Sequence, residues 1–125
     1  MGIVLKADDR GRITLPVMIE PYSLMPLWKN GVLYLIKVKQ LLVSITSFEE
    51  ATKFNNEIEK YRVKGLPYEI PRTYKPSNRI TIPKAVRVSK FWEFEETTFK
   101  FDSLGREVPA YKLIPLKVVP LKDSL

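Results

Sequence analysis

Positively charged side chains gather in one stretch of the sequence. Between residues 71 and 90 the chain carries six basic side chains and no acidic one. They are Arg72, Lys75, Arg79, Lys84, Arg87 and Lys90. Guanidinium and ammonium groups bind phosphates, and an arginine can also chelate the edge of a guanine base. The stretch is typical of a protein that binds a polyanion, although a solubilising surface could carry the same charge.

The rest of the composition limits the chemistry that is available. The chain has 125 residues and a net charge of +7, with no cysteine and no histidine. Disulfides, thiolate zinc sites, cysteine nucleophiles and imidazole bases are therefore excluded. No acidic cluster suits Mg²⁺ or Ca²⁺, and no glycine-rich loop suits a bound phosphate. We expect no enzymatic activity, no cofactor and no metal.

A five-residue motif occurs twice, and it predicts two equivalent strands. Residues 12–16 read Arg-Ile-Thr-Leu-Pro, and residues 79–83, 67 positions later, read Arg-Ile-Thr-Ile-Pro. Polar and apolar residues alternate, so the aliphatic ones share a face and are expected in the core. These residues are Ile13, Leu15, Ile80 and Ile82. The threonines are expected to favour the strand rather than to bind a ligand, and each proline is expected to end its strand.

The flanking sequence predicts two hairpins around the first copy. Residues 3–7 and 12–16 form the first hairpin, with the turn-forming residues 8–11 between them. Residues 17–30 contain two prolines and are expected to form no more than a helical turn. Residues 31–38 and 41–46 are rich in Val, Leu and Ile and form the second hairpin.

One amphipathic helix is expected over residues 48–64. Ser47 and Glu50 form a capping box at its start, and Gly65 provides the stop. One face of this helix is apolar and is expected to pack on the core. Its members are Phe48, Ala51, Phe54, Ile58 and Tyr61.

The second half repeats the organisation of the first. Residues 67–76 are extended, residues 84–88 form a short helical turn, and residues 92–101 and 108–114 form a hairpin. Trp92 is expected to be a packing residue. We divide the chain into a first hairpin unit (1–46), a connecting helix (47–66), a second hairpin unit (67–115) and a flexible tail (116–125).

Both copies resemble the signature of the AbrB-like swapped-hairpin DNA-binding family. That signature reads aspartate, two residues, glycine-arginine, aliphatic, any residue, aliphatic-proline, and residues 8–16 match it. Residues 75–87 resemble it too, including the arginine four positions after the proline. The departures are Lys75 in place of the aspartate, Asn78 in place of the glycine, and Glu20 where the family prefers arginine. The two-copy arrangement is similar to the branch typified by MraZ.

The resemblance implies a mainly β (α+β) fold in which two swapped-hairpin units form a small barrel. It also implies a transcriptional regulator that contacts double-stranded DNA through its basic hairpin loops. The residues expected at the DNA are Lys6, Arg10, Arg12, Arg72, Lys75, Asn78, Arg79, Lys84, Arg87 and Lys90. No apolar run is long enough to cross a membrane, and no leader is apparent, so we expect a cytoplasmic, nucleoid-associated protein.

Several alternatives stay open at this stage. Arg12 could serve structure by pairing with Asp8 rather than contacting DNA. The protein could be a nonspecific chromatin-type DNA binder, or an antitoxin or other protein-interaction module. The barrel could close within one chain, between two chains of a dimer, or in a larger homo-oligomer. Because the second copy lies in a stretch with basic residues and no acidic ones, we expect it to make most of the DNA contact.

Overall fold

The chain is mainly β with antiparallel sheets, as expected. The computed structural model describes residues 2–63 and 75–117. Within these ranges the elements are β1 (Ile3–Lys6), β2 (Arg12–Ile19), β3 (Leu24–Lys29), β4 (Val32–Lys37), α1 (Val38–Ser44), α2 (Phe48–Ile58), β5 (Ser77–Thr81), the 3₁₀ turn η1 (Lys84–Val86), β6 (Phe91–Phe101) and β7 (Arg106–Leu116). The strands form a five-stranded sheet in the order β1-β6-β7-β4-β3 and a two-stranded sheet of β2 and β5. No closed barrel is found among the described strands.

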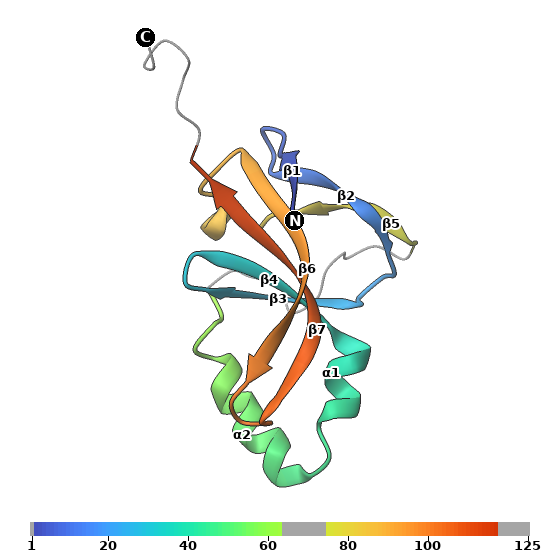
Figure 1. The fold of residues 1–125 in the computed structure, drawn as a ribbon, viewed down its shortest axis with the longest axis vertical. Helices are drawn as coiled ribbons and strands as arrows, with labels where there is room; N and C mark the ends of the chain where they lie inside the picture. Colours follow the sequence, from blue (N-terminus) through green and yellow to red (C-terminus); the bar gives the residue numbers. More distant parts are fainter. Residues whose placement is uncertain (1, 64–74, 118–125) are drawn as a thin grey trace.

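The two-stranded sheet and the helices occupy opposite ends of the molecule (Figure 1). The long β6–β7 hairpin runs from the upper end, where β1, β2 and β5 lie, to the lower end, where α1 and α2 lie. The predicted units do not form separate sheets, because β1 pairs with β6 and β4 pairs with β7. The expected hairpin at residues 92–101 and 108–114 is confirmed in β6 and β7, and the helical turn after the second motif in η1.

The two motif copies pair with each other. The prediction that residues 3–7 and 12–16 form a hairpin is wrong, since β2 runs antiparallel to β5. Ile13 lies opposite Ile80, its own equivalent in the other copy. Each arginine lies opposite the other copy's threonine, as Arg12 faces Thr81 and Arg79 faces Thr14. A local two-fold axis therefore passes through the Ile13–Ile80 pair. The alternation of polar and apolar residues correctly predicts which side chains are buried, but it carries no information on which strand is the partner.

The prediction that Pro16 ends its strand is wrong, although Pro83 does follow the end of β5. Strand β2 continues to Ile19, and its register with β5 shifts between Thr14 and Ile19. Pro16 lies in this irregular stretch, where its missing amide removes no ladder hydrogen bond.

The segment from residue 17 to residue 46 differs most from the prediction. In place of a helical turn, β3 and β4 form a hairpin through Asn30 and Gly31, whose φ angles are +52° and +76°. Asn-Gly is a strong signal for such a turn, because both residues tolerate positive φ. The predicted second strand of residues 41–46 is largely the helix α1. Strand β4 already pairs on both edges, with β3 and β7, so it has no free edge for residues 41–46.

Helix α2 is confirmed, but it ends at Ile58 rather than near residue 64. The hydroxyl of Ser47 accepts the amide of Glu50 at 3.1 Å, as a capping residue should. Phe54 and Ile58 are buried as expected, whereas Phe48 is 89% exposed and does not join the core.

Two apolar clusters hold the fold together. The first joins the paired motif strands to the five-stranded sheet, and the aliphatic residues predicted for the core, Ile13, Leu15, Ile80 and Ile82, are all buried in it. Trp92 is completely buried there, and its indole Nε1 donates to the Ser89 carbonyl at 3.0 Å. The second cluster lies under α1 and α2 around Phe54, Phe99 and Phe101.

Candidate nucleic-acid interface

The loop before β2 is organised by Asp8. One carboxylate oxygen of Asp8, Oδ1, accepts the backbone amides of Arg10 and Arg12, both at 2.9 Å. The other, Oδ2, accepts Arg12 Nε at 2.7 Å. The backbone amide hydrogen bond from Arg12 is the main reason why the pKa of Asp8 lies below its usual value. Arg12 therefore forms the ion pair with Asp8 that is the structural alternative to a DNA contact.

This loop rests directly on the basic segment of the second copy. The Gly11 carbonyl accepts the Ile82 amide at 2.8 Å, and the Lys90 carbonyl accepts the Ala7 amide at 2.7 Å. Gly11 has a φ of +76°, a backbone conformation that favours glycine, and the Arg87 side chain lies close against it. Residues 67 or more positions apart thus build one surface.

Arg87 is already engaged by the protein. Its Nη2 donates to the Ile82 carbonyl at 2.9 Å, and its side chain lies against Gly11. These contacts hold the first loop to the segment after the second motif. The geometry favours a positioning role for Arg87, whereas the sequence predicts that this residue contacts DNA.

The exposed side of the β2–β5 pair carries arginines from both copies. Because Ile13 and Ile80 point into the core, their neighbours along the strands point outward. We call these neighbours the outer face: Arg12, Thr14, Arg79 and Thr81. Thr14, Arg79 and Thr81 are exposed, and the Arg12 side chain retains 40% exposure beside Asp8. Within the described residues, the guanidinium of Arg79 forms no ion pair or hydrogen bond, whereas its backbone amide donates to Ser77 Oγ at 3.1 Å.

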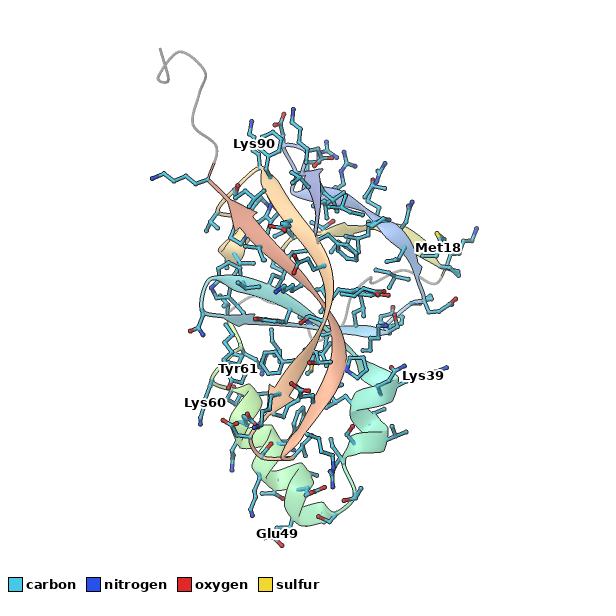
Figure 2. All side chains as sticks on the ribbon, viewed as in Figure 1. Met18, Lys39, Glu49, Lys60, Tyr61 and Lys90 are labelled. Carbon is cyan, nitrogen blue, oxygen red and sulfur yellow. The ribbon has the colours of Figure 1, made fainter. Side chains whose placement is uncertain are left out.

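The remaining predicted residues surround this face or the loop next to it. Lys84 and Lys75 are exposed, as is Asn78, and Lys75 has an interaction partner. Lys90 Nζ lies 3.9 Å from Asp9 Oδ1, and Lys6 Nζ lies 5.9 Å from the centre of the Phe91 ring. Lys90 marks the upper end of the molecule in Figure 2, far from Lys60 and Glu49 at the helical end. Arg72 lies outside the described residues.

The charge differs between the two ends of the molecule. Residues 6–14 and 75–90, which build the upper end, carry eight basic and two acidic side chains. Residues 38–63, which contain both helices, carry four basic and four acidic side chains, and some of these form ion pairs, such as Lys53–Glu49 at 3.2 Å. A polyanion would therefore be attracted to the upper end.

Two further features belong to this surface. Thr14 and Thr81 lie on the outer face opposite Arg79 and Arg12, on the side that the alternation predicts, although the sequence favours them as strand formers rather than ligands. A groove of about 640 Å³ also opens beside the loop, between Asp8, Arg87, Lys90 and Leu116. No pattern within a short stretch of sequence indicates this groove, because it forms where the end of β7 meets the loop.

Other kinds of site find little support in the described part of the chain. It contains no group of three or more acidic, cysteine or histidine residues that could hold a metal ion. No helix in residues 2–63 or 75–117 is long and apolar enough to cross a membrane. No protein-family model, curated protein or solved structure matches the chain significantly.

Proposed function

We propose that the protein binds duplex DNA through the outer face and the basic residues around it, and that it acts as a transcriptional regulator. The observation that carries this proposal is the β2–β5 pairing, which brings the arginines of both copies onto one exposed face. Lys84, three positions after Thr81, and Lys90, whose carbonyl accepts the Ala7 amide of the first loop, are exposed and would contact phosphates without reading sequence. The threonine hydroxyls between the arginines are additional donors for phosphates or base edges.

The proposal includes the swapped-hairpin organisation of the AbrB-like family. Pairing between strands of different copies, rather than within one copy, supports it. It also includes a non-enzymatic role in the cytoplasm at the nucleoid. Because the cross-copy pairs lie within one chain, a single chain supplies both arginines, and a homo-oligomer would add further faces.

The salt dependence of binding tests the proposal. If about six phosphates are neutralised, log affinity for duplex DNA should fall with log salt at a slope near −5, from about 0.9 per phosphate. Fluorescence anisotropy on a labelled duplex of about 25 base pairs measures this slope. The variant Arg79→Ala/Lys84→Ala should bind more weakly with a slope shallower by about two. A slope near zero for the unmodified protein would refute the proposal.

A matched control separates a defined face from diffuse charge. Lys53→Ala/Lys60→Ala removes the same number of charges at the helical end and should leave affinity within about twofold. Equal losses in the two double variants would mean that no particular face is used. A regulator should also prefer its own site over bulk DNA by about 10³ or more. A nonspecific chromatin-type protein would show no such preference.

A further inference from the structure

The two arginines of the outer face are related by the local two-fold axis, yet their surroundings differ. Arg12 Nε lies 2.7 Å from Asp8 Oδ2, within an ion pair. The residue four positions before Arg79, which corresponds to Asp8, is Lys75. Equivalent positions in the two halves therefore differ by two units of charge, from carboxylate to ammonium.

We propose that Asp8 is a specificity-determining residue that keeps the first half of the outer face from binding DNA as strongly as the second. This inference rests on the proposed function. The Asp8 carboxylate forms an ion pair with the Arg12 guanidinium, which would otherwise be available to a phosphate or a guanine edge. The negative charge of Asp8 also repels an approaching phosphate. Asp9, which is fully solvent-exposed, adds to this repulsion. The half with Arg79 is thus the anchor of the complex.

This asymmetry has a consequence for how the protein lies on DNA. A surface with two equal halves could sit on a duplex in either of two orientations related by the axis through Ile13 and Ile80. Because one half has Asp8 at the position where the other half has Lys75, the two orientations of the protein on DNA are unequal in energy. The protein therefore binds in one preferred orientation, and its target need not be a symmetric inverted repeat.

Single substitutions at the two arginines test the inference. Arg79→Ala should weaken binding to a 25-base-pair duplex about fivefold to tenfold, with a salt slope shallower by about one. Arg12→Ala should weaken it less than about twofold, because Arg12 is held by Asp8. Asp8→Asn should tighten binding, and Arg12→Ala made in that variant should then cost as much as Arg79→Ala. Anisotropy titrations at several salt concentrations measure all four.

The Asp8→Asn variant retains the amide oxygen that can accept from the Arg10 and Arg12 amides, so the loop can keep its shape. Circular dichroism and a thermal melt check this. The variant Lys75→Asp provides a test that leaves the first loop untouched. It places a carboxylate before Arg79 and should weaken binding more than Lys75→Ala does. Lys60→Ala is the control for a change of one charge elsewhere.

The outcomes separate the two proposals. If the unmodified protein binds duplex DNA with a steep salt slope but Arg12→Ala and Arg79→Ala cost the same, the inference is overturned and the proposed function stands. Lys75→Asp losing no more affinity than Lys75→Ala would also overturn the inference. If the unmodified protein shows no salt-dependent binding, both are overturned.

Discussion

Glu57 is a buried carboxylate that accepts several hydrogen bonds from another element of the fold. It lies on α2 with 5% of its surface exposed. Its Oε2 accepts the Asp102 amide at 2.9 Å, and its Oε1 accepts the Ser103 amide at 2.9 Å and the Ser103 hydroxyl. Burial alone would raise the pKa of Glu57, but the hydrogen bonds from Ser103 and Asp102 outweigh it and the pKa is lowered. The ionised carboxylate therefore fastens α2 to the turn between β6 and β7.

Replacement of Glu57 by Gln should destabilise the fold by about 1–3 kcal/mol near neutral pH. The amide presents an NH₂ group to backbone donors, so at least one of them loses its acceptor. Urea denaturation of both proteins measures the difference in the free energy of unfolding. Because the folded pKa is lowered, the carboxylate contributes stability above its unfolded pKa of about 4.5, and the contribution is lost as pH falls through the folded pKa. The difference should shrink below about pH 4, and one that did not change with pH would contradict this account.

At the residue scale, local patterns were enough for the core isoleucines and for the Asp8–Arg12 pair. Both depend on neighbours within a few positions along the chain. Glu57 could not have been identified, because its partners lie 45 and 46 positions away. The contact between Arg87 and Gly11 could not have been identified either, because the two residues lie far apart along the chain.

At the scale of elements, the junction between the two helices shows a capping box displaced by one residue. Ser47 Oγ caps the Glu50 amide as expected. Glu50 reaches back not to Ser47 but to Thr46, where its Oε1 accepts the backbone amide at 3.0 Å and the hydroxyl at 2.8 Å. Arg106 on β7 also contacts Glu50 at 3.3 Å. The start of α2 is thus joined both to the linker that follows α1 and to the β6–β7 hairpin.

Ser47→Ala should cost about 1 kcal/mol of stability, because the Glu50 amide at the start of α2 loses its acceptor. Chemical denaturation measures this loss, and Ser47→Asp should recover most of it, since aspartate is an equally good cap. Full stability in Ser47→Ala would show that water replaces the hydroxyl at no cost.

Elements with local signals were predicted well, and elements defined by their partners were not. The cap of α2 and the strands of the β6–β7 hairpin carry their own patterns. Residues 41–46 are rich in Val, Leu and Ile and are predicted as a strand, yet most of them form part of α1. Their state depends on β4 having both edges paired, which no window of sequence contains.

For the whole molecule, the central feature is that each half of the chain completes the other. Ile13 and Ile80 are 1% and 2% exposed, and they meet across the β2–β5 pair. The first core cluster contains residues from both halves, among them Leu33 and Leu113, which also pair across β4 and β7. The packing of this shared core therefore sets the positions of the outer-face residues, which alternate with core residues along β2 and β5.

Ile13→Ala and Ile80→Ala should each destabilise the whole protein by about 2–5 kcal/mol, as truncations in a packed core do. The double variant should cost less than the sum of the two, because the residues share one packing site. Thr14→Ala and Thr81→Ala, on the exposed side of the same strands, should change stability by less than about 0.5 kcal/mol. Denaturant melts followed by tryptophan fluorescence measure all of these, and strict additivity at Ile13 and Ile80 would contradict a shared site.

The pairing of β2 with β5 also governs how the chain acquires its structure. The paired residues of β2 and β5 are about 60 to 70 positions apart, and β1 pairs with β6, about 90 positions later in the chain. During synthesis the first half therefore emerges with apolar strands whose partners have not yet been translated. Folds dominated by such distant contacts close slowly, on the order of milliseconds to seconds. Until the second half leaves the ribosome, we expect chaperones to bind the exposed apolar strands of the first half.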